Sequence, residues 1–450
     1  MTIFARWLPP IALVGALSLV PVASASLAAA DVDTYKEMET FMSVFQQVRT
    51  NYVDKVDDHV LIKGAIDGML AALDPHSSYA EASEFTQLKT TTDGNYGGLG
   101  LTVGMEDGAV KVIAPTEDSP ADKAGIKSGD YITNIDGTYI YGYSLDEATD
   151  KLRGTPGTKV KLTLVRPGRD KPFDVVVTRE KIDLKVVKWE VHDGVGVVNI
   201  NSFSQETGAM TRAAIAAIDR QTGGKTLGYV VDLRSDPGGL LDQAIEVSDA
   251  FLDHGEIVSE RGREANDIER FYAKAGDDAH GLPVIVLIDA GTASAAEIVA
   301  GALQDHRRAL VMGERSFGKG SVQTVLQTGP RSALRLTTAR YYTPSGRSVQ
   351  AGGIDPDIAV PQLSDADYKD RPRFREADLR RHLVSQVGVK DEVLEADGQP
   401  DPRFTATAAE LEKKGVKDFQ LTYAIDTLKR LAPPVAPARV AAQASVKKGR

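Results

Sequence analysis

The chain has 450 residues, a formal net charge of -10 and no cysteine. Its length fits two to four domains, and the negative charge argues against nucleic acid as a general partner. The absence of cysteine excludes thiol catalysis, disulfide bonds and a lipid-modified N-terminal cysteine.

The first thirty residues have the pattern of a secretory signal. Arg6 is the one charged residue among them, an apolar run spans Ile11 to Val22, and small residues follow at 23–25 and 28–30. We therefore expect residues 1–30 to be a signal peptide and the protein to be exported, as a periplasmic protein. An uncleaved membrane anchor is the alternative, because residues 7–30 carry no charge.

Residues 31–92 are expected to form an N-terminal helical region. Two apolar stripes at helical spacing run through it, and their members are Phe41, Val44, Phe45, Val48, Ile62, Ile66, Met69 and Leu73. These faces suit a neighbouring element or a second subunit, so a homo-oligomer is predicted. Pro75 breaks the helix, and we interpret the adjacent His76 as a structural turn residue.

Residues 93–180 alternate short strands with two short helices. Strands are predicted near 110–113, 131–135, 160–165 and 173–178, and one helix is predicted over 144–152. A glycine-rich loop leading into an edge strand can accept a peptide by strand addition and hold its terminal carboxylate. The candidate peptide-binding residues are Gly98, Leu99, Gly100 and Leu101 in the loop and Leu145, Ala148 and Leu152 on one helix face. This order of elements resembles a PDZ domain.

Residues 181–361 have an α/β pattern. Strands are expected at 195–200 and 227–233, a helix at 207–222, and another helix that ends near Leu252. The second strand leads into Arg234-Ser235-Asp236-Pro237-Gly238-Gly239. Two glycines there would let the backbone approach a ligand closely, as an oxyanion hole requires.

The stretch from Val284 to Gln323 holds the strongest catalytic candidates. An apolar strand over 284–288 is followed by a small-residue turn and a helix from Ala295, so Ser294 lies at a helix start where free N–H groups favour negative charge. The alternative is that Ser294 and Glu297 merely form a capping box. Lys319 lies between two glycines, and an amine kept neutral by burial can activate a serine.

Two segments here, 291–295 and 313–323, resemble the core of the C-terminal processing peptidases, also called tail-specific proteases. The resemblance implies an α/β protease core of the crotonase-like ββα type, with an inserted or preceding PDZ domain. It also implies a catalytic dyad of Ser294 and Lys319, with Gln323 orienting the lysine. An oxyanion hole would use the Ala295 N–H and either Gly238 or Gly239.

The same resemblance implies what the protein binds. Its substrates would be proteins with apolar C-terminal tails, and an adaptor protein would be a further partner. No metal and no cofactor are implied. Two residues depart from the family pattern: Ala296 replaces a common serine, and Asp236 replaces a common asparagine and adds a negative charge near the proposed oxyanion donors.

Three other functions are alternatives. Residues 313–319 have the form G-x-x-x-x-G-K of a phosphate-binding loop, but Gly320 stands where a hydroxyl residue is needed and a strand follows. A Ser-His-Asp hydrolase would use His306 or His254 as its base. A catalytically silent PDZ scaffold is the non-enzymatic alternative, although all three catalytic candidates are present.

Residues 362–431 are charged and are expected to form a C-terminal helical region. One helical stripe, made by Leu421, Ala424, Ile425 and Leu428, suits a packing surface and adds to the expectation of self-association. Residues 432–450 hold three prolines and only positive charges, so a disordered tail is predicted.

Overall fold

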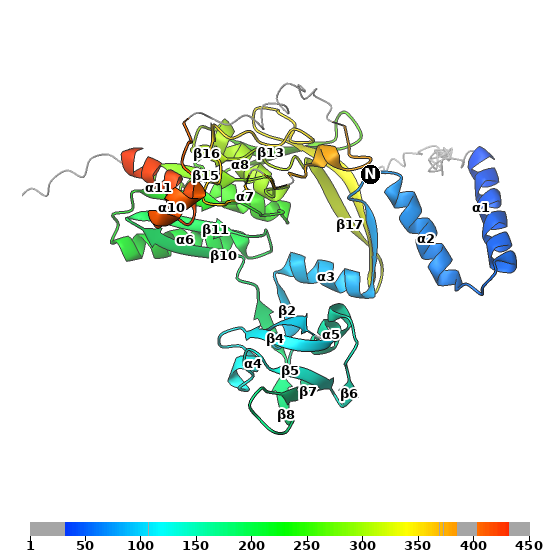
Figure 1. Ribbon diagram of the computed structural model, residues 1–450. Coiled ribbons are helices and arrows are strands. Elements are labelled where there is room, and N and C mark those ends of the chain that lie inside the picture. The colour runs from blue at the N-terminus through cyan, green and yellow to red at the C-terminus, as the bar shows by residue number, and fades with distance from the viewer. Residues whose placement is uncertain (1–31, 107, 369, 372, 385–402, 432–450) are drawn as a thin grey trace, which may run out of the picture. The chain divides into compact units, whose positions relative to one another are not determined.

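The computed structural model describes residues 32–106, 108–368, 370–371, 373–384 and 403–431 (Figure 1). The predicted signal peptide and the predicted disordered tail lie outside these residues. The chain divides into two compact units, residues 1–66 and 67–450.

The first unit contains helix α1 (Val32–Asn51) and most of helix α2 (Asp58–Ala71), which continues into the second unit. Large apolar side chains of α1 are exposed to solvent, and they include Tyr35, Met38, Phe41, Met42, Val44 and Val48. Among the helices in the described residues, none is both long and apolar enough to cross a membrane.

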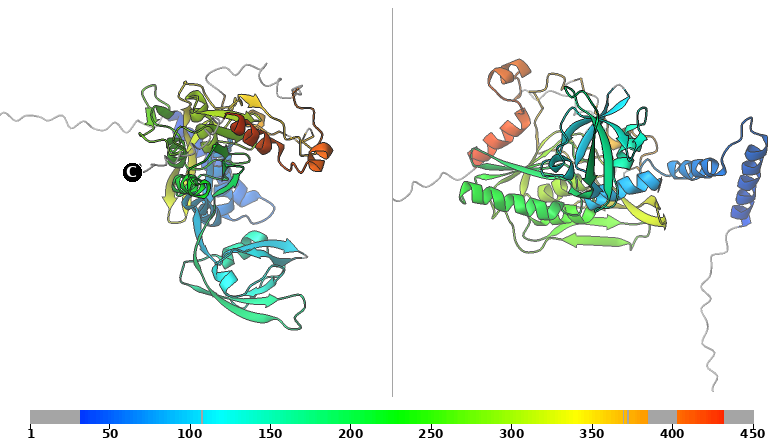
Figure 2. Two further views of the ribbon diagram at one scale, coloured as in Figure 1. Left: turned by 90° about the vertical axis from the view of Figure 1, so that its left-hand side faces the viewer. Right: turned by 90° about the horizontal axis from the view of Figure 1, so that it is seen from below.

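A sheet of six strands forms the domain between residues 101 and 178. Its strands are β3 (Leu101–Glu106), β4 (Ala109–Pro115), β5 (Tyr131–Ile135), β6 (Thr138–Tyr139), β7 (Lys159–Val165) and β8 (Phe173–Thr178). The order is β3-β4-β5-β7-β8, with β6 paired to β5, and all pairs are antiparallel. Helices α4 (Pro120–Lys123) and α5 (Leu145–Leu152) complete the domain, and Figure 2 shows its cyan-to-green strands gathered together.

The alternation of side chains explains this domain's core. Along β7, Val160, Leu162 and Leu164 are buried whereas Lys159 and Lys161 are exposed, as expected for a strand with one face in the core. Strands β2 (Asn95–Gly98) and β9 (Glu180–Asp183) pair antiparallel at the two ends of the domain. The chain therefore enters and leaves this domain through one two-stranded ribbon.

The α/β part of the chain is built on a six-stranded sheet in the order β10-β11-β12-β15-β16-β19. Its strands are β10 (Val187–His192), β11 (Val195–Ile200), β12 (Gly228–Asp232), β15 (Val284–Ile288), β16 (Ala309–Gly313) and β19 (Ile358–Ala359). The β10–β11 pair is antiparallel and the other pairs are parallel. Every residue of β12 and β15 is buried, as in parallel strands that are covered on both faces.

Helices cover both faces of this sheet. Val231 and Val286 pack with α6 (Thr207–Thr222), α7 (Leu241–Asp249) and α8 (Ala295–Asp305). Their neighbours Val230 and Ile285 point to the opposite face because side chains alternate along a strand, and there they pack with α11 (Phe419–Leu431).

The stripe on α11 is therefore a packing surface, but for the sheet of its own chain. Ala424 and Leu428 are fully buried, and Leu421 and Ile425 pack partly buried in the same cluster. This corrects the expectation that the C-terminal stripe serves self-association.

A separate antiparallel sheet joins distant parts of the chain. It has the order β1-β18-β13-β14, with β17 also paired to β18. Its strands are β1 (Ser78–Glu81), β13 (Glu256–Arg261), β14 (Ile268–Tyr272), β17 (Ser321–Gly329) and β18 (Ser332–Tyr342). Because β1 precedes α3 (Ala82–Asp93) and the PDZ-like domain in sequence, that domain is inserted between core elements. The C-terminal part adds a short helix at Glu376–Asp378 and α10 (Ala408–Lys413).

Candidate active site

Ser294 lies in the tight turn between β15 and α8. Its backbone has φ 57° and ψ -117°, a left-handed conformation that costs a residue with a Cβ on the order of 1–3 kcal/mol. The turn is held by Thr292, whose hydroxyl donates to the Leu233 carbonyl oxygen at 2.8 Å. Such strain persists only where surrounding contacts enforce it, and it is frequent at catalytic residues.

The hydroxyl of Ser294 meets another hydroxyl. Ser294 Oγ lies 2.9 Å from the Tyr341 hydroxyl, and both side chains are buried. The Glu297 N–H donates to the Ser294 carbonyl oxygen at 2.9 Å. Burial raises the pKa of Tyr341, so this phenol is neutral at physiological pH. The sequence did not single out Tyr341, because it lies on β18, far along the chain from the serine.

Glu297 joins the serine turn to the lysine loop. Its fully buried carboxylate accepts the Ser294 N–H at 2.8 Å, the Ser316 hydroxyl at 2.5 Å, the Gly318 N–H at 2.7 Å and the Lys319 N–H at 2.9 Å. Burial raises the pKa of Glu297 to about 7, against the lowering effect of these hydrogen bonds. The sequence suggested Glu297 only as a helix-capping residue; its contacts with the lysine loop had no local signal.

Lys319 has the electrostatic surroundings of a lysine that can lose its proton near neutral pH. Burial lowers the pKa of Lys319 to about 8, and the positive charge of Arg335 adds to this effect. Glu376, Glu297 and Asp74 act in the opposite direction. At pH 7 a pKa of about 8 leaves roughly a tenth of the amine neutral, which is enough for a general base.

Gln323 lies at the start of β17, four residues after the lysine. Its Nε2 donates to Ser321 Oγ at 2.9 Å and to Thr337 Oγ1 at 3.2 Å. Within the described residues, neither Gln323 nor Ser294 makes a side-chain hydrogen bond to Lys319 Nζ. The structure thus brings the serine turn and the lysine loop together at Glu297, and the dyad itself stays a prediction.

The glycine turn after β12 lies against the serine. A Cβ on Gly238, whose φ is 91°, would stand 2.8 Å from both Ser294 Cβ and the Ala295 nitrogen, so only glycine fits. The Gly238 N–H donates to Asp236 Oδ1 at 2.8 Å. In contrast, the N–H groups of Ala295 and Gly239 donate to no other residue in the described part of the chain.

Asp236 is enclosed beside these donors. Its Oδ2 is buried and has no hydrogen-bond partner among the described residues. Burial raises the pKa of Asp236 to about 8, and the hydrogen bond from Gly238 only partly offsets it. The sequence predicted a negative charge at this position, whereas the buried carboxyl is mostly neutral at pH 7.

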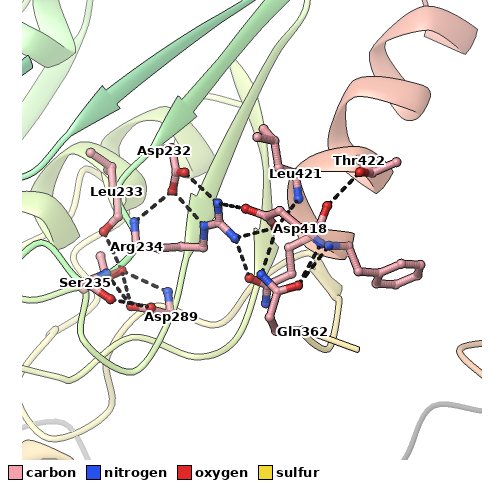
Figure 3. A network of polar contacts seen from close by, with 12 residues as sticks. Asp232, Leu233, Arg234, Ser235, Asp289, Gln362, Asp418, Leu421 and Thr422 are labelled. Atoms are coloured by element: carbon pink, nitrogen blue, oxygen red, sulfur yellow. Dashed lines mark hydrogen bonds and ion pairs between the residues drawn. The ribbon is translucent and has the colours of Figure 1, made fainter. Parts of the chain in front are cut away.

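The start of the same turn is held by the C-terminal part of the chain (Figure 3). The Arg234 guanidinium donates to both oxygens of Asp232 at 2.8 and 2.7 Å and to both oxygens of Asp418 at 3.0 and 2.8 Å. Asp418 in turn accepts from Gln362 Nε2 at 2.8 Å and from the Leu421 N–H at the start of α11 at 3.0 Å. Helix α11 is thereby tied to the turn that carries the glycines.

The candidate peptide-binding residues separate into two groups. Leu99, Ala148 and Leu152 are buried in the core of their domain, with exposed fractions of 2%, 0% and 6%. Leu145 is exposed at the start of α5, a helix that packs near the edge strand β3 on which Leu101 lies. The N–H groups of Leu99 and of Gly100, which follow Gly98 in the loop, donate to no residue in the described ranges. These N–H groups and the edge of β3 are the backbone groups in this domain that could bind the C-terminal end of a peptide.

The histidine alternative does not fit the structure. His306 caps the far end of α8, so the rise of that helix places it roughly 18 Å from Ser294. Its Nε2 lies 2.7 Å from the Glu256 carbonyl oxygen. The side chain of His254 is 88% exposed, and it contacts Asp253.

A phosphate-binding loop does not fit either. Residues 313–319 connect β16 to strand β17 and not to a helix, so the helix N-terminus that such a loop needs is missing. In the part of the chain that the structure describes, His, Asp and Glu side chains form no group of three or more that could hold a metal ion.

Comparison with known families gives three matches along the chain. The pattern of Peptidase family S41 matches residues 194–360, the PDZ domain pattern matches residues 97–177, and the N-terminal domain of the activating protease CtpB matches residues 20–84.

Individual relatives agree with these matches. A carboxy-terminal-processing protease of Bartonella bacilliformis is 50% identical over 368 residues, covering 81% of this chain and 85% of the relative. Carboxy-terminal processing protease CtpB of Bacillus subtilis is 34% identical and covers 74% and 70%. Among solved structures, a photosystem II D1 C-terminal processing protease matches with 28% identity and a TM-score of 0.42, covering 72% of this chain and 93% of that one.

Proposed function

This chain belongs to the carboxy-terminal processing proteases of peptidase family S41, serine-type peptidases with a PDZ domain, and we propose that it is an exported endopeptidase with a Ser294–Lys319 dyad. The observation that carries the proposal is the Glu297 carboxylate. By accepting both the Ser294 and the Lys319 N–H, it holds the two catalytic segments against each other.

The proposed reaction passes all of its protons through Lys319. Neutral Lys319 removes the Ser294 hydroxyl proton while Oγ attacks the scissile carbonyl, and the resulting ammonium then protonates the leaving amine. Lys319 next takes a proton from the water that hydrolyses the acyl-enzyme, and it returns that proton to Ser294 Oγ as the acyl bond breaks, which restores the neutral amine. Its pKa of about 8 suits both roles, because an amine near the working pH can accept and return a proton. Gln323 would orient the amine once its present hydrogen bonds rearrange.

Two backbone N–H groups would stabilise the oxyanion. The Ala295 N–H lies at the start of α8, where the helix dipole favours negative charge. Of the two glycines, we assign the second donor to Gly239, because the Gly238 N–H already donates to Asp236.

We assign substrate choice to the PDZ domain. A C-terminal carboxylate would bind the Leu99 and Gly100 N–H groups, and the preceding residues would extend along β3. Leu145 would then contact an apolar side chain of the tail. Proteins with apolar C-terminal tails are the proposed substrates, with delivery by an adaptor protein and location in the periplasm as further proposals from the sequence.

A homo-oligomer is proposed from helix α1. Its apolar side chains are exposed, with Met38 at 55% and Val44 at 58%, and exposed apolar faces of this kind mark protein contacts. The occupant that we propose is a second copy of this chain, in keeping with the predicted stripe. The mass of the purified protein in solution tests the idea.

Purified protein and an unfolded protein substrate test the dyad. Ser294→Ala and Lys319→Ala are each expected to lower kcat by at least about a thousandfold. Lys319→Arg should fail equally, since arginine stays protonated. His254→Gln is the control and should keep wild-type turnover. If Lys319→Ala retains turnover, the lysine is not the base; if wild-type protein cleaves nothing, the alternative of a silent PDZ scaffold is favoured.

A further inference from the structure

His76 lies in the segment that precedes the PDZ domain, and it contacts a buried carboxylate from the far end of the chain. His76 Nε2 is 2.8 Å from Glu376 Oε2 and 3.1 Å from Glu376 Oε1. Glu376 has no exposed surface. A buried carboxylate is costly unless it is paired and hydrogen-bonded, so this contact is a substantial part of its environment.

Glu376 is tied to the lysine loop on both sides of Lys319. On one side, the Glu376 N–H donates to the Phe317 carbonyl oxygen at 3.0 Å. On the other, Gln350 bridges the two segments, since its Nε2 donates to Glu376 Oε1 at 2.9 Å and its Oε1 accepts the Gly320 N–H at 3.0 Å. The backbone that carries the lysine is therefore fixed through Glu376.

The same segment also reaches Gln323. Asp74 accepts the His76 and Ser77 N–H groups at 2.8 Å each and the Ser77 hydroxyl at 2.9 Å. Ser77 Oγ accepts the Thr337 N–H at 3.1 Å, and Thr337 Oγ1 accepts from Gln323 Nε2 at 3.2 Å. Two chains of hydrogen bonds thus lead from residues 74–77, one to the loop that carries the proposed base and one to its orienting residue.

We propose that His76 and Glu376 are positioning residues of the catalytic lysine, in which His76 fixes Glu376 and Glu376 fixes and electrostatically tunes Lys319. This inference rests on the proposed function. It gives a task to the turn histidine that the sequence marked only as structural.

The charges around Lys319 determine the sign of the effect. Burial and Arg335 lower the pKa of Lys319, while Glu376, Glu297 and Asp74 raise it. Lys319 must be neutral to act, so turnover rises as pH increases through its pKa. Removing the Glu376 charge favours the neutral amine, and the acid limb of the pH profile then moves to lower pH.

Glu376→Gln is the decisive variant because it removes the charge and keeps the shape. Its amide oxygen can still accept from Gln350, while its NH₂ group faces His76. We expect the acid limb of kcat to move to lower pH, with KM for a short peptide changed less than about twofold.

Glu314→Gln is the matched control. Like Glu376, Glu314 is bonded to another segment of the chain, through Arg373 at 2.9 Å, but its carboxylate is only partly buried and it is not among the charges that face Lys319. Its pH profile should superimpose on that of the wild type. If Glu376→Gln superimposes as well, Glu376 does not tune the lysine and the proposal is overturned.

His76→Ala tests positioning separately from charge. Loss of the contact with Glu376 should lower kcat by about tenfold to a hundredfold at nearly constant KM, and His76→Gln should recover part of it through its amide donor. Equal kcat in His76→Ala and wild type would show that His76 does not position Lys319.

A readout independent of turnover keeps the test valid for inactive variants. Competitive labelling with acetic anhydride, followed by mass spectrometry, reports the proton affinity of Lys319 in each folded variant. Glu376→Gln should lower the apparent pKa of Lys319, and an unchanged value would contradict the inference. If Lys319→Arg keeps turnover, the dyad fails; labelling would still show whether Glu376 acts on the lysine.

Discussion

Replacing Asp236 with asparagine is expected to stabilise the folded core at neutral and alkaline pH but not at acid pH. The folded carboxyl keeps its proton to a pKa of about 8, whereas the unfolded one loses it near 3.8. Between these values the native state holds more protons than the unfolded state. The free energy of unfolding therefore falls as pH rises through this window.

The size of the effect follows from the shift. Each pKa unit corresponds to about 1.4 kcal/mol, so the buried carboxyl costs roughly 4 kcal/mol of stability at pH 7. Asparagine carries no such cost, and its Oδ1 can still accept the Gly238 N–H. Its NH₂ group, however, replaces an oxygen that has no partner among the described residues, at a cost of about 1–3 kcal/mol. The net gain near pH 7 is thus about 1–3 kcal/mol.

Thermal unfolding of wild type and Asp236→Asn at several pH values measures this. For a core of this size, Tm should rise by about 2–4 °C per kcal/mol near pH 8, and the gain should vanish or reverse near the unfolded pKa of 3.8. Asp426→Asn, whose side chain is 61% exposed, is the control and should show no pH-dependent difference. A Tm difference for Asp236→Asn that is the same at acid and alkaline pH would refute the assignment of a buried, protonated carboxyl.

Two further outcomes are expected. Asp418→Asn weakens the attachment of Arg234 to α11 and should cost about 1–2 kcal/mol in urea unfolding, with a lower kcat; Asp426→Asn on the same helix is the control, and equal stability of the two variants would contradict the role of Asp418. Deleting residues 32–51 should reduce the mass measured by light scattering to that of a smaller species, and an unchanged mass would exclude α1 from the contact between subunits.

The local elements of the fold could be predicted because each has its own sequence signal. The strand at 284–288 is a five-residue apolar run, and the helix after it begins where small residues end the turn. The helix at 207–222 and the strands at 131–135 and 173–178 also have the predicted bounds. Periodicity and turn chemistry were sufficient at these positions.

Contacts between distant segments could not be predicted in this way. His76 and Glu376 are 300 positions apart, and nothing near either residue indicates the other. The stripe on α11 has the spacing of any amphipathic helix, so the sequence could not distinguish its own sheet from a second subunit. The apolar strands β12 and β15 indicate that both faces of their sheet are covered, but a single sequence does not state which helix covers the second face.

The residue type determines the ordinary pKa of a side chain, but burial determines whether that side chain titrates near neutral pH. Burial raises the pKa of Glu297 to about 7 and that of Asp236 to about 8, and it lowers the pKa of Lys319 to about 8. Two acids and one base thus titrate in nearly the same range, although their ordinary pKa values are several units apart. Glu297 bonds directly to the Lys319 backbone and acts on its charge, so a proton lost by one changes the affinity of the other. The pH profile of this protease should therefore belong to the group as a whole, and a charge-removing variant such as Asp236→Asn, or the labelling of Lys319, is needed to assign one limb of it to one residue.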